Sequence, residues 1–204
     1  ARTGLGTTSP NPMVGAVVVR AGEIIGRGFH QKAGEPHAEP NAINDCEIDD
    51  LSDCELYVTL EPCCHTNKRT PPCTSLIIEK GIRKVHVATL DPNPSVSGKG
   101  VKILENAGVQ VSVGLLEREA AALNEVFNKT ILSNLPFVHL KLAQTLDGKL
   151  ATLSGDSKWI TDENARTRVH ELRLKYDAVM VGRNTLNNDD PSLDIRMGID
   201  AKDK

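Results

Sequence analysis

The sequence has few aromatic side chains, no long apolar segment and no excess of charge of one sign. Three Phe, two Tyr and one Trp among 204 residues are too few for the stacking platforms that bind single-stranded nucleic acid. The net charge of −3 falls on residues 1–135 and the remainder is balanced, so neither part has the basic excess of a nucleic-acid-binding domain. We therefore expect a small-molecule substrate and no nucleic-acid partner.

Apolar runs such as 13–19 fall far short of the roughly 20 residues of a transmembrane helix, and no signal-peptide pattern opens the chain. The contents of 39% hydrophobic and 25% charged residues exclude a disordered chain. We expect a folded cytoplasmic protein without a membrane partner.

Cysteines are absent outside residues 46–73. An odd number without a secretory signal argues against a disulfide framework and favours metal or thiol chemistry. The five are Cys46, Cys54, Cys63, Cys64 and Cys73.

Predicted strands and helices alternate through residues 1–135, as in a layered α/β domain. The predicted strands cover 13–19, 23–29, 55–60, 84–90 and 109–113, the first two forming a hairpin through residues 20–22. The predicted helices cover 38–46, 73–80, 99–107 and 117–132.

A domain boundary is predicted at residues 133–136, where turn-forming residues end the last of these helices. Beyond it we expect strands over 137–143 and 178–182 and a helix over 162–175. Fewer than 70 residues with one helix between two strands should leave apolar surface uncovered. We expect the natural chain to continue beyond Lys204, and its start at Ala1 also to be clipped.

A possible metal site is formed by His37, Cys63 and Cys73, which supply ligands suited to a tetrahedral zinc with an open fourth position. Glu39 would then shuttle protons of the bound water. Pro40 favours a helix beginning here, so that His37 and Glu39 lie at its entrance. Cys73 also begins a predicted helix, whose partial positive charge favours a thiolate.

The alternative is that the His-x-Glu occurs by chance and the cysteines only pack, which is how we interpret Cys46 and Cys54. His65 could be a fourth ligand, but it would close the catalytic position. The combination of His-x-Glu, Pro-Cys and a later Cys at a helix start is the outline of zinc-dependent base deaminases.

Longer motifs carry a closer resemblance, which covers nearly the whole chain. In the first part they are Thr8-Ser-Pro-Asn-Pro12, Val14-Gly15, Gly28, His30, Gly34, His37-Ala-Glu39, Glu61-Pro-Cys-Cys-His-Thr-Asn-Lys-Arg-Thr-Pro-Pro-Cys73 and Asp91-Pro-Asn-Pro94 with Gly98 and Gly100. In the second they are Lys141-Leu-Ala, Leu146-Asp-Gly148, Gly155-Asp-Ser157, Trp159-Ile-Thr161 and Asp189-Asp-Pro191-Ser-Leu193. These motifs resemble the bifunctional riboflavin-biosynthesis deaminase/reductases.

The resemblance implies a cytidine-deaminase-like three-layer α/β/α domain over residues 1–135. In that family this domain uses Zn²⁺ to deaminate a diaminopyrimidinone that carries a ribosylamino 5′-phosphate. Asn11 and His30 would contact the substrate, and Arg69 would approach its phosphate. The structural alternatives are a turn asparagine, a strand-end histidine and a solvated arginine.

The resemblance implies that residues 136–204 are the first part of a dihydrofolate-reductase-like domain that reduces the ribosyl group with NADPH. No Gly-x-Gly-x-x-Gly motif is present, which argues against an ordinary Rossmann domain. By motif position the NADPH residues are Ala143, Trp159, Thr185 and Asp189, and the substrate residues are Ser157, Arg173, Leu193 and Arg196. Trp159 could instead pack in a core, and Arg173 could be a surface charge.

Two other functions fit parts of the pattern. One is a deaminase of another nucleobase or of tRNA, which the near-neutral charge and the long loop between Cys63 and Cys73 disfavour. The other is a structural zinc module, which would need four protein ligands. A homo-oligomer is possible on sequence grounds.

Overall fold

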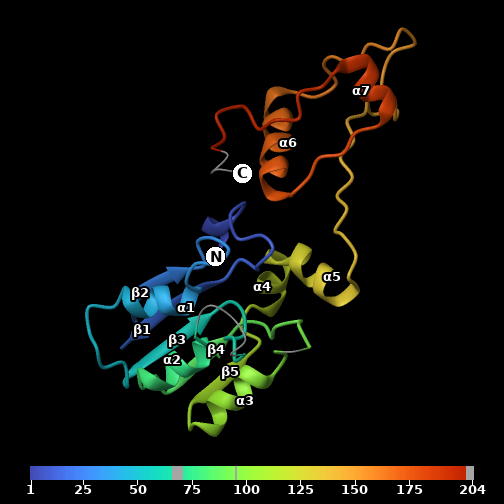
Figure 1. Ribbon diagram of the computed structural model, residues 1–204. Helices are drawn as coiled ribbons and strands as arrows, with labels where there is room; N and C mark the ends of the chain where they lie inside the picture. The colour runs from blue at the N-terminus through green and yellow to red at the C-terminus, as the bar shows by residue number, and fades with distance from the viewer. Residues whose placement is uncertain (66–70, 95, 201–204) are drawn as a thin grey trace. The chain divides into compact units, whose positions relative to one another are not determined.

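Five strands form one mixed sheet in the computed structural model, which describes residues 1–65, 71–94 and 96–200 (Figure 1). The strand order is β2-β1-β3-β4-β5. β1 is antiparallel to β2 and β3, whereas β3, β4 and β5 are parallel. Each strand lies where it was predicted, with ends displaced by three residues or fewer. The bounds are β1 Gly15–Arg20, β2 Glu23–Phe29, β3 Cys54–Val58, β4 Lys84–Val87 and β5 Gln110–Val113.

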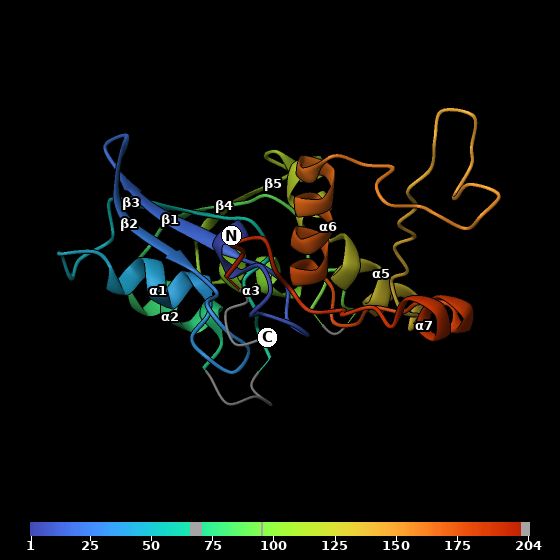
Figure 2. The same ribbon diagram turned by 90° about the horizontal axis from the view of Figure 1, so that it is seen from above.

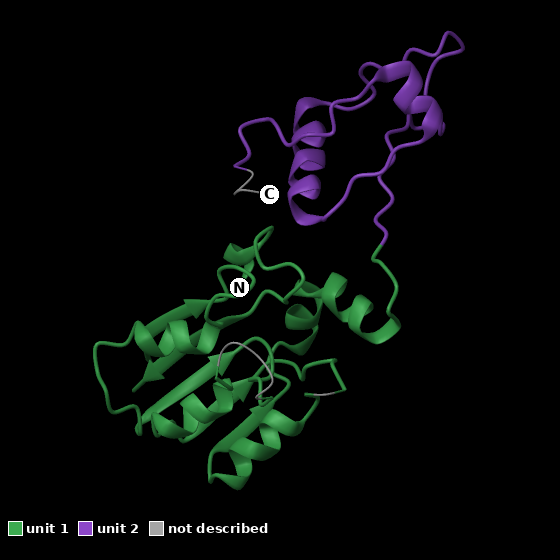
Figure 3. Ribbon diagram, viewed as in Figure 1, with its two compact units in different colours: residues 1–137 green, residues 138–204 purple. Residues whose placement is uncertain are grey.

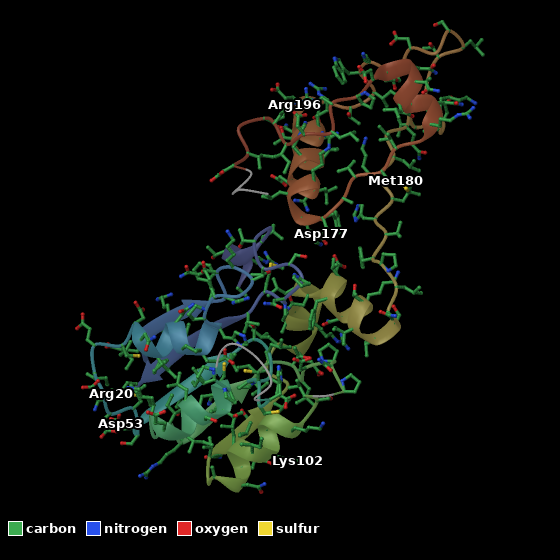
Figure 4. All side chains as sticks on the ribbon, viewed as in Figure 1. Arg20, Asp53, Lys102, Asp177, Met180 and Arg196 are labelled. Atoms are coloured by element: carbon green, nitrogen blue, oxygen red, sulfur yellow. The ribbon has the colours of Figure 1, made fainter. Side chains whose placement is uncertain are left out.

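The predicted hairpin joins β1 to β2. Ala21 and Gly22 make the turn with positive φ angles of 50° and 85°, the backbone region that primed hairpin turns require. At the hairpin end of β1, Arg20 Nε lies 2.8 Å from Asp53 Oδ2, beside the start of β3 (Figure 4).

One face of the sheet is covered by α1 (Ala38–Asn44), α2 (Cys73–Glu79) and α3 (Lys99–Asn106) (Figure 2). Alternate strand residues point into this core because side chains alternate along a strand. Its fully buried members include Val18, Leu56, Ile77, Val85, Val87 and Leu104.

Gly28 allows α1 to pack closely against β2. A Cβ at Gly28 would lie 2.2 Å from the Ala42 nitrogen and 2.3 Å from the Ala38 oxygen. Only a residue without a side chain fits such a close backbone approach.

The opposite face is bordered by α4 (Glu117–Leu123), because one hollow is lined both by α4 and by outward residues of β1, β3 and β4. The three predicted layers are therefore α1–α3, the sheet, and α4. The prediction of one helix over 117–132 is wrong, since α5 (Glu125–Ser133) is separate. Asn124, at φ −112° and ψ 31°, interrupts the helical backbone.

Two compact units divide the chain, Ala1–Phe137 and Val138–Lys204 (Figure 3). In the second, α6 (Glu163–Lys175) lies where a helix was predicted, and Asp162 caps it by accepting a hydrogen bond of 2.8 Å from the Ala165 N–H. A second helix, α7, spans Arg183–Asp189.

The strands predicted over 137–143 and 178–182 are wrong, because residues 138–200 contain no strand. A strand needs a neighbour to pair its backbone groups, and neither segment pairs within the described part. Apolar side chains here are accordingly exposed, with Leu140 at 77% and Met180 at 92%; Met180 is labelled in Figure 4. Throughout the residues that the structure covers, no helix has the length and apolar character to cross a membrane.

Candidate metal centre

Strand polarity places the predicted residues of the first unit at one edge of the sheet. β2, β3 and β4 run in one direction and β1 runs in the other, so the start of β1 lies beside the ends of its neighbours. Asn11 precedes β1, His30 and His37 follow β2, and Cys63 follows β3. Open α/β sheets bind their ligands at this carboxyl edge.

Three potential metal ligands converge there: His37, Cys63 and Cys73, whose ligand atoms all lie within 4.8 Å of one another. His37 is the N-cap of α1 and Cys73 is the first residue of α2. The Cys73 N–H donates to the Cys63 sulfur at 3.3 Å, which ties the two cysteines together.

The distances fit a tetrahedral zinc ion. Bonds of about 2.0 Å to nitrogen and about 2.3 Å to sulfur would separate these atoms by about 3.6 Å. His37 Nδ1 lies 3.6 Å from Cys63 Sγ and 3.4 Å from Cys73 Sγ. One imidazole and two thiols are also a donor set that zinc prefers.

Glu39 lies in the first turn of α1 and is only 2% exposed. Its Oε2 atom is buried and has no hydrogen-bond partner among the described residues, an arrangement that is rare without a functional reason. Burial raises the pKa of the Glu39 carboxyl to about 7, and the nearby Cys63 acts in the same direction. Such a group can accept and release protons near neutral pH.

A cavity of about 530 Å³ adjoins these groups. Its lining residues come from several segments at this sheet edge and from α5. They are Pro10, Asn11, Pro12, Val14, His30, Gly34, Glu35, His37, Glu39, Leu60, Glu61, Cys63, His65, Asp91, Asn93, Val96, Phe127 and Ile131.

The structure brings together two of the predicted substrate residues, Asn11 and His30. His30 Nδ1 lies 3.1 Å from the Pro36 carbonyl and therefore donates to it. In the neutral ring Nε2 then accepts from the Asn11 amide at 3.2 Å. Burial lowers the pKa of His30, with His37 adding to the effect, which favours this neutral form.

The remaining predictions for this unit have mixed outcomes. Arg69 lies outside the described residues. His65 lines the cavity but is not in the three-residue ligand cluster found in the described part of the chain. Burial raises the pKa of the Cys54 thiol to about 11, so this thiol is unreactive and packs in the core as expected.

Glu61 begins one of the sequence motifs, but the sequence analysis gave it no role of its own. Its carboxylate is 3% exposed and accepts four backbone N–H bonds of 2.9–3.2 Å, from Asp91, Gly98, Gly100 and Val101. Glu61 thereby holds the loop after β4 and the start of α3 against the metal centre. The motif of Asp91, Gly98 and Gly100 contains three of the residues whose N–H groups bind Glu61. The motif itself does not indicate that Glu61, 30 residues earlier in the sequence, is their partner.

The second unit has a separate pocket of about 670 Å³. It brings together five predicted residues: Ala143, Ser157, Trp159, Arg173 and Arg196. Thr185, Asp189 and Leu193 do not line it. Trp159 is 70% exposed, which excludes core packing here, and the Arg166 guanidinium lies 4.5 Å from its ring centre.

Arg173 has a specific partner in this pocket. Its Nη1 donates to the Asp194 carbonyl at 2.6 Å, so it is not merely a solvated charge. The Arg196 N–H donates to His170 Nδ1 at 3.1 Å. Both contacts fix the segment around residues 194–196 against α6.

Two protein families match separate parts of the chain. Residues 2–89 match the cytidine and deoxycytidylate deaminase zinc-binding region. Residues 136–203 match the RibD C-terminal domain. The first match contains His37, Glu39, Cys63 and Cys73.

Curated relatives and solved structures match both parts at once. Riboflavin biosynthesis protein RibD of Aquifex aeolicus is 56% identical over 94% of this chain and 53% of its own length. The RibD protein of Actinobacillus pleuropneumoniae is 53% identical over 97% of this chain and 52% of its own length. The chain thus spans about half the length of the curated relatives it matches.

A crystal structure from Thermotoga maritima, of a diaminohydroxyphosphoribosylaminopyrimidine deaminase/5-amino-6-(5-phosphoribosylamino)uracil reductase, shares 52% identity with a TM-score of 0.92, covering 97% of this chain and 56% of that one. A structure of Acinetobacter baumannii RibD shares 46% identity with a TM-score of 0.88, and the match covers 98% of this chain and 56% of that one. Over the residues that it spans, the chain is therefore similar to the riboflavin biosynthesis proteins RibD.

Proposed function

We propose that the first unit is a zinc-dependent deaminase of riboflavin biosynthesis. Its substrate would be 2,5-diamino-6-ribosylamino-4(3H)-pyrimidinone 5′-phosphate. The observation that carries this proposal is the buried Glu39 carboxylate in a cavity that His37 and Cys63 also line. The sequence matches to RibD supply the substrate class.

His37, Cys63 and Cys73 would hold the zinc, since three protein ligands are the usual number in catalytic zinc sites. When bound, zinc lowers the pKa of water toward neutrality. Glu39 accepts a proton from the attacking water and returns it to the leaving amine. One C–O bond forms and one C–N bond breaks, which yields the aminouracil and ammonia.

Asn11 and His30 would orient the pyrimidine beside Glu39. Their mutual hydrogen bond fixes both side chains at the cavity wall, and a positioned substrate reacts faster than a mobile one. Arg69 remains our prediction for the phosphate contact.

The second unit would contribute part of an NADPH-dependent reductase that converts the ribosyl group to ribityl. Ala143, Trp159, Thr185 and Asp189 would contact the cofactor. The substrate residues would be Ser157, Arg173, Leu193 and Arg196. The pocket that joins five of these eight residues supports the assignment.

The test is ammonia release from the pyrimidine phosphate by the zinc-loaded chain, with cytidine as a control substrate. Glu39→Gln should keep its zinc and lose activity by about 10²–10⁴-fold, because the amide cannot accept a proton. A variant that keeps more than about a tenth of wild-type turnover would contradict the role of Glu39.

A parallel assay follows NADPH oxidation with the deaminated product. We expect none from this chain, because the described part of the second unit forms no sheet and leaves Trp159 exposed. Clear NADPH turnover would show that this unit suffices for reduction.

A further inference from the structure

The break between α4 and α5 holds a buried side chain with two specific hydrogen bonds. Asn124 is 5% exposed. Its Oδ1 accepts from the Met13 N–H at 2.8 Å, and its Nδ2 donates to the Met13 carbonyl at 2.9 Å. One amide thus satisfies both backbone groups of a residue 111 positions away in the sequence. Only a side chain with a donor and an acceptor side by side can do this.

Met13 belongs to the segment that carries Asn11 into the cavity. Pro10, Asn11, Pro12 and Val14 all line that cavity, whereas Met13 does not. Hydrogen bonds also hold the segment on both sides of Met13. The Asn11 amide bonds to His30 at 3.2 Å, the Val14 carbonyl accepts from the His30 N–H at 3.0 Å, and the Gly15 N–H donates to the Thr59 hydroxyl at 3.0 Å. The Asn124 amide therefore fixes the backbone between the two residues that meet His30.

The same side chain lies at the start of the helix that forms the facing wall, because Asn124 is the N-cap residue of α5. Phe127 and Ile131 of that helix line the cavity. They are four positions apart and therefore share one face of α5. Asn124 therefore joins the start of α5, with its cavity-lining face, to the segment around Asn11.

We infer that Asn124 is a positioning residue for the substrate of the proposed deaminase. It acts through Met13 on the placement of Asn11, and it touches neither the substrate nor the metal ligands. Its loss should weaken substrate binding while leaving the metal centre and the chemical step intact. This inference rests on the proposed function.

Asn124→Asp is the sharpest variant. The aspartate keeps the acceptor for the Met13 N–H, but it places a carboxylate oxygen where the amide donated to the Met13 carbonyl, so an attraction becomes a repulsion. Asn128→Asp is the matched control, at a position within α5. Asn128 donates to the Ala121 carbonyl at 3.1 Å and does not line the cavity.

The experiment measures kcat and KM for ammonia release, together with zinc content, in the zinc-loaded chain. We expect Asn124→Asp to raise KM about tenfold, as for the loss of one buried hydrogen bond, with kcat within about twofold and one zinc per chain. Asn128→Asp should leave KM unchanged. Asn124→Ser supplies one hydroxyl in place of the amide and should give an intermediate KM. It replaces Asn124→Asp in the test if the aspartate variant does not fold.

Two results would overturn the inference. An unchanged KM with a lower urea midpoint would mean that Asn124 is only structural, and a joint loss of zinc and kcat would mean that it supports the metal centre. Hydrogen exchange of the Met13 amide separates this inference from the proposed function. Wild-type protein that holds zinc but releases no ammonia would overturn the proposed deaminase, whereas fast Met13 exchange in Asn124→Ala, but not in Asn128→Asp, would still establish the contact.

Discussion

Gly28→Ala tests how the close packing of α1 against the sheet supports the metal centre. The new Cβ would lie 2.2 Å from the Ala42 nitrogen and 2.3 Å from the Ala38 oxygen. Both are backbone atoms, so no side-chain rotation can relieve the contact. The helix or the strand must move.

The size of this movement follows from contact distances. Non-bonded heavy atoms normally lie about 3.5 Å apart, so α1 must retreat from β2 by roughly 1 Å. Overpacking of this kind costs about 1–3 kcal/mol of folding free energy. His37 is the N-cap of α1, and metal–ligand distances tolerate only about 0.2 Å of change. Zinc affinity should therefore fall together with stability.

The assay combines zinc titration against a competing chelator with urea unfolding of the apo and zinc-loaded chains. Gly182→Ala is the matched control, because its nearest neighbour would be the Thr185 hydroxyl at 3.9 Å, an ordinary contact. If Gly28→Ala bound zinc as tightly as wild type and unfolded at the same urea concentration, α1 would not be held in the way described.

Two further predictions concern the ligands and the outer sheet face. Cys73→Ser should lose bound zinc, whereas Cys64→Ser should keep one zinc per chain by metal analysis; the reverse pattern would refute the ligand assignment. Hydrogen bonds from Lys84 and His86 lower the pKa of the Glu55 carboxyl in the folded protein. The contribution of the Glu55 carboxylate to stability is therefore complete above the unfolded-state pKa of about 4.3. It is lost as the pH falls through the lower pKa of the folded state. Urea midpoints of wild type and Glu55→Gln should therefore converge with falling pH, and a constant difference would contradict this.

Local sequence patterns were enough to predict most of the first unit and the three residues that meet at the candidate metal centre. His37 and Cys73 each stand at a helix start, which proline residues and spacing indicate without knowledge of the fold. The central strands β3 and β4 show alternating burial, and the period of two is visible in the residues themselves. The NADPH and substrate residues came from resemblance alone and remain predictions.

Only the tertiary structure showed what depends on distant residues. Three features depend on segments far apart in the chain: the burial of Glu39, the four N–H groups around Glu61, and the contact between Asn124 and Met13. Periodicity predicted one helix through Asn124 because it cannot register a side chain that bonds elsewhere. It also predicted strands over 137–143 and 178–182 from β-forming residues, but a strand exists only when another strand pairs with it. Pairing and burial are properties of the folded chain, and a local pattern carries no information about them.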